Sequence, residues 1–289
     1  MTTTQVLRAR YPRASANLRR YGGVVTGPLA SFGELAWFVI SVTRDMGWAL
    51  AYYRKEILRL IAEIGMGTGA LALVGGTSVI MAFVTLSTGS LVAIQGLASL
   101  GQIGIQALLG FVAALINVRL VAPDVAGIVL AATVGAGATA ELGAMRVSEE
   151  IDALEVMGIK STAYLVATRT LAGLVVVIPL YALGLIMSFV SPAIITTVIY
   201  GQAPGTYNHY FRTFLRPDDV FWSFAMVIVM SVVVMFIHCY YGYNASGGPV
   251  GVGEAVGRAM RMSLISVPVV VLLFQMSIYG VDPNFAFTV

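Results

Sequence analysis

Long apolar runs separated by short charged connections make up most of this chain. Between Ile64 and Ala140 the charged residues are Arg119 and Asp124 alone. A membrane-spanning helix needs roughly 20 mainly apolar residues, so this stretch is long enough for two spans. The same pattern predicts five spans in all, at about 64–92, 106–138, 161–190, 220–241 and 259–281.

Apolar runs of this length favour helices, because backbone groups in hydrocarbon must form their hydrogen bonds within the segment itself. The alternation over about ten residues that is typical of barrel strands is not seen. Composition agrees: 58% of the residues are hydrophobic and 11% charged, against about 45–50% and 25% in soluble domains. We therefore expect an all-α integral membrane protein, with residues 64–289 forming its membrane domain.

Residues 1–63 form a basic N-terminal region. Within it, 44–63 shows an apolar stripe opposite a charged face, which predicts an amphipathic helix at the membrane interface. Residues 24–42 are long enough to span but contain Glu34 and Pro28, so we expect them to lie in or dip into the interface. A sixth span is the alternative. The stripe of 44–63 comprises Met46, Leu50, Tyr53, Ile57, Leu60 and Ile64.

The distribution of lysine and arginine predicts the orientation. Residues 1–63 carry nine, and the connections 141–160 and 242–261 carry two each. With five spans these segments share one side, which the positive-inside rule assigns to the cytoplasm. The C-terminus is then outside. The outer connection 191–219 contains aromatic residues at helical spacing, which predicts a short helix that anchors the protein or docks a partner: Tyr207, Tyr210, Phe211 and Phe214.

Several functional classes are excluded. Gly135 to Ala140 fits a dinucleotide-binding pattern, but it follows a membrane-length run rather than a short strand, so close helix packing explains it better. No G-x-x-x-x-G-K-[ST] motif occurs, so we expect no ATP site in this chain. One cysteine and two histidines exclude an internal disulfide and predict no metal site. No feature points to nucleic acid.

Arg119 and Asp124 are candidates for a transport path, because ionisable residues inside the membrane are functional candidates by default. They lie five positions apart and so do not share a helix face. Pro123 lies between them and is predicted to interrupt the helix. Structural pairing or snorkelling to a membrane boundary is the alternative.

The segment from Glu141 to Ile159 is the most acidic part of the chain. Ser148 can cap a helix, and acids directly after it favour the helix N-terminus. Gly158 can end the helix in a left-handed conformation. We therefore predict a short amphipathic helix at about 148–157, with Ile151, Leu154 and Met157 on its apolar side. It is either a solvated connection or a docking element.

A resemblance to a known family bears on this choice. The stretch "AELGAMRVSEEIDALEVMGI" resembles the signature E-[IL]-G-x-M-[RK]-V-[ST]-E-[EQ]-I-x-A-[LM] of MlaE/YrbE-type permeases. "GYNASGGPVGVGEAVGRA", Gly242 to Ala259, is similar to that family's glycine-rich cytoplasmic turn. The resemblance extends from about residue 50 to the C-terminus. It is closest to the YrbE subunits of actinobacterial Mce (mammalian cell entry) systems.

The resemblance implies a non-catalytic permease subunit of an ABC-type lipid importer in a bacterial inner membrane. Its partners would be a second permease, a cytoplasmic ATPase dimer that holds ATP and magnesium, and Mce-domain proteins outside. Residues 141–158 would form the region that couples to the ATPase, through Glu141, Arg146, Glu149, Glu150, Asp152 and Glu155. The cytoplasmic turn would involve Gly242, Tyr243, Gly247, Gly248, Gly251 and Gly253.

Two departures from the family pattern concern the lipid path. Many members read R-E-x-x-P where this chain has Leu120 after Arg119, and many have arginine where it has Thr133. Both changes remove a charge, which suits pairing with a non-identical permease that keeps it. Arg119, Asp124 and Thr133 are the candidate transport-path residues. An ion-coupled transporter or channel would need several buried acids, and a non-transporting scaffold is a third possibility.

Overall fold

The computed structural model describes residues 33–66 and 76–280. Five helical segments in this part of the chain are long and apolar enough to cross a membrane. They are α4 (Thr77–Gln102), the segment Gln106–Val147, the segment Thr162–Ile199, α11 (Pro217–Tyr243) and α12 (Gly248–Ile278). The all-α, five-span prediction is confirmed.

The first span lies later in the chain than predicted. A separate helix, α3, covers Arg54–Met66, and α4 begins only at Thr77. The Gly/Ser-rich stretch after residue 92 was expected to be a connection, but α4 continues through it to Gln102. Gly96 explains this, because a methyl group there would lie 2.6 Å from Leu109. Small residues here allow close packing of two helices rather than ending one.

The second span is a single helical run built from α- and π-helical pieces. α5 (Leu109–Ile116), α6 (Ala122–Leu130) and α7 (Ala136–Val147) are joined by two π turns. The predicted interruption at Pro123 is wrong. A π turn (Asn117–Val121) ends two residues before Pro123. Its wider backbone accommodates a residue that lacks an N–H group, so the helix continues through Pro123.

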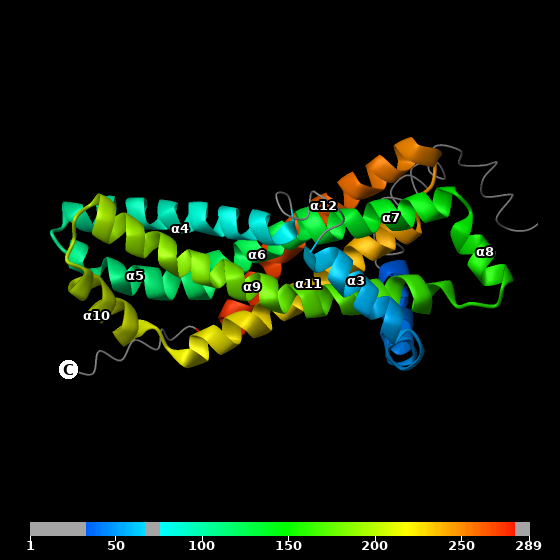
Figure 1. Cartoon of the computed structure of the whole chain (residues 1–289), viewed down its shortest axis with the longest axis horizontal. Helices are drawn as coiled ribbons and strands as arrows, with labels where there is room; N and C mark the ends of the chain where they lie inside the picture. Colours follow the sequence, from blue (N-terminus) through cyan, green and yellow to red (C-terminus); the bar gives the residue numbers. More distant parts are fainter. Residues whose placement is uncertain (1–32, 67–75, 281–289) are drawn as a thin grey trace, which may run out of the picture.

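The helices pack around α11, which contacts α7, α9 (Thr168–Ile194) and α12. α4 runs along α9, and α10 (Pro204–Phe214) lies against α5. Figure 1 shows α10 at one end of the bundle and α8 (Glu150–Val156) at the opposite end. We call these the α10 end and the α8 end.

The predicted amphipathic segment 44–63 is divided between two helices. Residues 33–52 are helical, the helix breaks at Tyr53, and α3 follows. Helix 33–52 is not among the five candidate spans and packs at the α8 end, where the Phe38 ring lies 5.4 Å from that of Tyr240. Ile57 of the predicted stripe is buried, whereas Leu50 is exposed. Residues 24–32 lie outside the described residues.

The aromatic helix predicted at the α10 end is present as α10. Tyr207 is buried, the Phe211 ring lies 5.2 Å from Phe189, and the Phe214 ring lies 4.6 Å from Phe111. Gly110 of α5 lies directly under the helix, where any side chain would collide with the Tyr207 carbonyl. α10 is therefore held against the bundle by its aromatic side.

Candidate functional site

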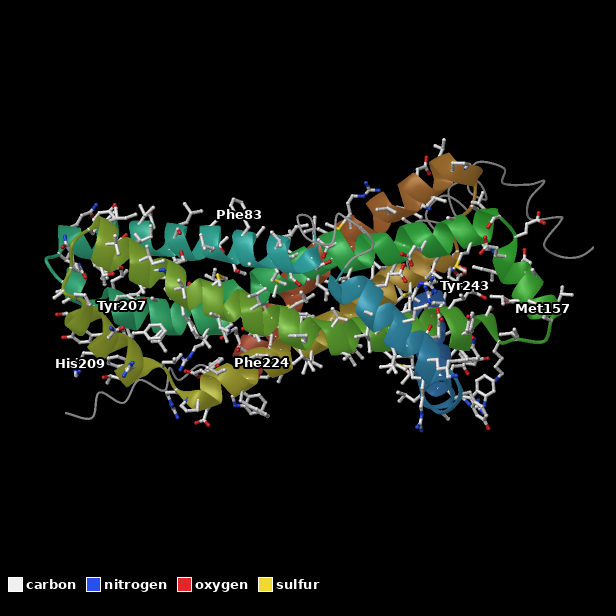
Figure 2. The ribbon with its side chains drawn as sticks, in the orientation of Figure 1. Phe83, Met157, Tyr207, His209, Phe224 and Tyr243 are labelled. Atoms are coloured by element: carbon white, nitrogen blue, oxygen red, sulfur yellow. The ribbon has the colours of Figure 1, made fainter. Side chains whose placement is uncertain are left out.

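α8 stands clear of the bundle between the second and third spans (Figure 1). Ile151 is fully buried and anchors it. On the predicted apolar side, Leu154 is half-buried and packs against the core, whereas Met157, labelled at the α8 end in Figure 2, is 66% exposed. The neighbouring Val156 is 90% exposed. Ile151 and Leu154 therefore attach this seven-residue helix to the bundle, and its other residues remain exposed.

The helix does not begin at Ser148 as predicted. α7 continues to Val147, and the Ser148 hydroxyl lies within hydrogen-bond distance of two acceptors, the Ala144 carbonyl behind it at 3.0 Å and the Glu150 carboxylate at 2.9 Å. The chain reverses at Glu149, whose φ of 62° is left-handed and strained for a residue other than glycine. At the other end, the prediction that Gly158 adopts a left-handed conformation is confirmed by its φ of 78°.

The structure divides the predicted coupling acids into different environments. Glu141 lies within α7 and pairs with Arg169 at 3.4 Å. Arg146 pairs with Asp152 at 2.7 Å, which ties the end of α7 to α8. Glu149 and Glu150 are exposed at the start of α8.

Glu155 points away from these acids. Its Oε1 accepts hydrogen bonds from the Ser161 hydroxyl at 2.6 Å and the Tyr243 hydroxyl at 3.1 Å. These two bonds, the one from Ser161 first, hold the pKa of the Glu155 carboxyl below its usual range. Glu155 therefore remains ionised at neutral pH, and it is tied to the base of the bundle.

The glycine-rich turn is much shorter than predicted. α11 continues to Tyr243 and α12 begins at Gly248, so only residues 244–247 lie between them. Gly247 and Gly248, with φ of 92° and 70°, allow this reversal. Gly251 and Gly253 lie in α12, and a side chain at Gly251 would collide with the Ser246 carbonyl.

Gly242 sets the closest approach of α11 and α7. A methyl group there would lie 2.9 Å from the Thr139 carbonyl oxygen, and this backbone atom cannot move aside. We expect Gly242→Ala to lower the free energy of unfolding by about 1–3 kcal/mol through overpacking. The chain's one cysteine, Cys239, is buried, so the reaction of its thiol with a dye during heating measures unfolding.

Gly253→Ala is the matched control for this experiment. A methyl group at Gly253 meets nothing within 4 Å among the described residues, so the variant should be neutral or gain up to about 1 kcal/mol in helix propensity. Equal unfolding temperatures for the two variants would contradict the close packing of α7 on α11.

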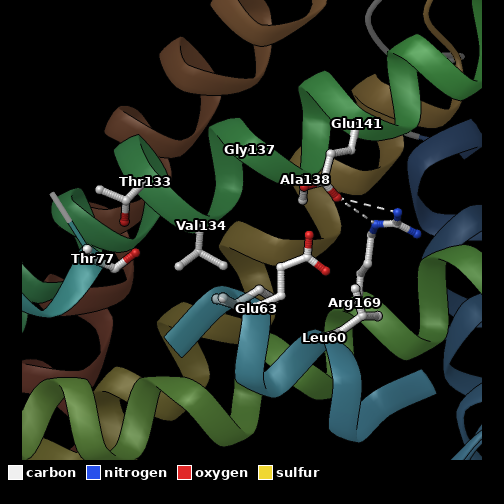
Figure 3. A pocket seen from close by; sticks show the side chains of 11 residues that line it. Leu60, Glu63, Thr77, Thr133, Val134, Gly137, Ala138, Glu141 and Arg169 are labelled. Carbon is white, nitrogen blue, oxygen red and sulfur yellow. Dashed lines mark hydrogen bonds and ion pairs between the residues drawn. The ribbon is translucent and has the colours of Figure 1, made fainter. Parts of the chain in front are cut away.

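A cavity of about 220 Å³ opens between α3, the start of α4, α7 and the third span. Figure 3 shows the carboxylates of Glu63 and Glu141 on its wall, with the Arg169 guanidinium reaching Glu141. Arg169 is 7% exposed in its side chain. We call this cavity the lateral pocket; its wall consists of Leu60, Glu63, Ile64, Gly76, Thr77, Thr133, Val134, Gly137, Ala138, Glu141 and Arg169.

The three candidate transport-path residues do not come together. Thr133 lines the lateral pocket, and its hydroxyl donates to the Val129 carbonyl. Arg119 pairs with Asp219 at 2.9 Å and lies 4.3 Å from the centre of the Tyr279 ring. Asp124 is partly exposed and is not the partner of Arg119. Of the three, only Thr133 contributes to the pocket.

Sequence reasoning missed two residues of the pocket wall, Arg169 and Glu63. Arg169 is the single charge in the third apolar run, and an ionisable residue in that setting is a recognisable signal. Glu63 pairs with Arg59, one helical turn before it, at 3.0 Å. Its place on the pocket wall depends on the packing of α3, which local spacing does not reveal.

These features define a multi-pass α-helical membrane protein with an exposed connecting helix and a charged lateral pocket. Comparison with known proteins then specifies the family. Residues 67–277 match the model of the family Permease MlaE, and the chain belongs to that family.

Several similar proteins are named as probable ABC transporter permeases. A probable ABC transporter permease of Synechocystis sp. is 31% identical over 68% of this chain and 74% of its own length. One from Rickettsia bellii is 28% identical over 64% and 72%. The chloroplastic protein TRIGALACTOSYLDIACYLGLYCEROL 1 of Arabidopsis thaliana is 28% identical over 74% of this chain, which spans 58% of that relative's length. A permease of this class works with an ATPase partner.

Proposed function

We propose that this chain is one transmembrane subunit of an ATP-driven lipid transporter, and that α8 is the element on which the partner ATPase acts. One observation carries the proposal. α8 lies outside the bundle between two spans and presents exposed apolar Val156 and Met157 together with exposed Glu149 and Glu150. A short helix with this surface fits a groove that has an apolar floor and a basic rim.

The orientation follows from this assignment. The α8 end faces the cytoplasm of a bacterial cell, in agreement with the basic residues of the connections on that side. The N-terminus is then cytoplasmic and the C-terminus extracytoplasmic, in the inner membrane. ATP and magnesium bind the ATPase, and this chain catalyses no reaction itself.

A lipid substrate is supported by the lateral pocket. Its wall combines Glu63, Glu141 and Arg169 with hydroxyl groups, and it lies beside apolar helix faces, so a polar headgroup and apolar chains both find suitable surfaces. The Arabidopsis relative also carries the name of a glycerolipid. We propose that a lipid passes this pocket in the inward direction.

The remaining partners complete the assembly. Leu120 and Thr133 stand where related permeases carry charges, so we propose a second, non-identical permease that supplies them. α10 and its connections face the extracytoplasmic side, where they contact Mce-domain proteins. The exposed side of α10 includes Asn208, His209 and Thr213.

Purification of the native complex through a tag on this chain tests the proposal. We expect an ATPase and a different permease in the complex, each identified and counted by native mass spectrometry, together with bound lipid. An assembly without an ATPase would contradict the transport function. An ATPase with two copies of this chain and no second permease would contradict only the non-identical pairing.

A further inference from the structure

Three polar side chains meet where α8 joins the bundle. The Ser161 and Tyr243 hydroxyl groups lie 2.7 Å apart, and both can donate to the same atom, Oε1 of Glu155. Glu155 belongs to α8, Ser161 precedes the third span, and Tyr243 ends α11. The triangle therefore connects one exposed helix to two spans.

The surrounding residues hold this triangle in place. The Phe38 ring of helix 33–52 lies 6.0 Å from the Tyr243 ring. Thr162, next to Ser161, donates to the Asp45 carboxylate at 2.8 Å. Ser161 itself is buried. Helix 33–52 thus contacts residues on both sides of the place where α8 joins the bundle, and these contacts restrict the side chains of the triangle.

The opposite end of α8 is attached differently. Arg146 and Asp152 form the ion pair there, and both side chains are substantially exposed. Exposed ion pairs are weak and solvent-screened. They also connect α8 only to α7, its immediate predecessor. Among the described residues, the triangle is the polar connection from α8 to helices beyond α7.

We propose that Glu155, Ser161 and Tyr243 form a strut that transmits displacement of α8 to the third span and α11. The inference rests on the proposed function, because it takes the ATPase to move α8. Glu155 is then a positioning residue that links helices, and Glu149 and Glu150 remain as the acids that meet the ATPase. Hydrogen bonds suit this role because they are short and directional. When α8 tilts, it must either move both spans with it or break these hydrogen bonds.

The variants separate hydrogen bonding from charge. Tyr243→Phe and Ser161→Ala each remove a hydroxyl, and Glu155→Ala removes the acceptor. Glu155→Gln loses the charge but keeps an oxygen, and both bonds end on a single oxygen, Oε1. Tyr241→Phe is the matched control, because the Tyr241 hydroxyl forms no hydrogen bond within the described part of the chain and the residue lies on the same turn of α11.

The readout is a distance between spin labels at the α10 end. Ile103 and Phe221 are exposed there and accept labels in a Cys239→Ser background. The complex with its ATPase is placed in vesicles of native polar lipids and trapped with ATP and vanadate. We expect the unmodified complex to change this distance, and Tyr243→Phe to reduce the shifted population about 2- to 10-fold, the effect of one hydrogen bond on an equilibrium.

The outcomes are distinguishable. The strut requires that Tyr243→Phe, Ser161→Ala and Glu155→Ala keep ATPase binding and reduce the shifted population, and that Glu155→Gln restores most of that population. Weakened ATPase binding in both Glu155 variants would make Glu155 a docking acid and overturn the strut. If all four variants showed the same distance change as the control Tyr241→Phe, the strut would also be overturned. An unmodified complex without an ATPase would contradict the proposed function instead.

Discussion

Replacing Glu149, Glu150 and Asp152 together by lysine is expected to abolish binding of the ATPase while leaving the membrane fold intact. All three side chains are exposed on or beside α8, so the substitutions bury nothing and reverse the surface charge, from three negative to three positive. Lysines placed against the basic rim of the ATPase groove bring like charges together, which costs several kcal/mol. At about 1.4 kcal/mol per factor of ten, binding should weaken at least about 100-fold.

The measurement is the amount of ATPase that co-purifies with the tagged chain, read beside the unfolding temperature. Asp218→Lys is the control, because Asp218 is a similarly exposed acid at the α10 end. It should leave ATPase binding unchanged. Since Asp152 also pairs with Arg146, Glu149→Lys with Glu150→Lys alone shows whether that pair matters. Unchanged association in the triple variant would contradict the docking role of α8.

Asp219→Asn is expected to lower the free energy of unfolding by about 3–5 kcal/mol, because it leaves a buried charge without its partner. Arg119 and Asp219 are 14% and 7% exposed and lie 2.9 Å apart. Arg119 keeps the face of the Tyr279 ring at 4.3 Å. That contact offsets only part of the loss, since a cation over an aromatic ring contributes about 0.5–2 kcal/mol.

Two further variants make this prediction specific. Asp218→Asn removes one member of the exposed pair Arg216–Asp218 at the start of α11 and should change stability by less than about 0.5 kcal/mol. Arg119→Leu combined with Asp219→Leu removes both charges and should recover most of the loss. Thiol-dye unfolding at Cys239 measures all of these. Equal effects of Asp219→Asn and Asp218→Asn would show that the pair is not buried in the membrane.

Pairings across long sequence separation explain most of what sequence reasoning missed at the candidate site. Arg119 and Asp219 are 100 residues apart, Tyr243 and Glu155 are 88 apart, and Arg169 and Glu141 are 28 apart. Spacing rules apply to side chains on one helix, so they could not distinguish Asp124 from Asp219 as the partner of Arg119. They also could not show that Glu155 accepts hydrogen bonds from Ser161 and Tyr243 of the bundle.

Helix boundaries were missed for a related reason. Ser148 can cap a helix that follows it or bond to one that precedes it, and both choices are local and similar in energy. The packing of α7 against α11 and α12 extends α7 to Val147, and the Ser148 hydroxyl then bonds backward. Likewise, Gly96 is locally typical of a loop, and only its close packing against Leu109 shows that it belongs to a helix.

The sequence by itself determined that the chain crosses the membrane as helices and that it does so five times. It also determined that an aromatic helix lies in the long connection between the third and fourth spans, and that a charged connection separates the second and third spans. These features follow from a local requirement, because each segment in hydrocarbon must satisfy its own backbone and expose an apolar surface. Only the tertiary structure decided which charges pair, which acids of that connection remain exposed, and where the lateral pocket opens. Those outcomes depend on which helices meet, and no single segment carries that information.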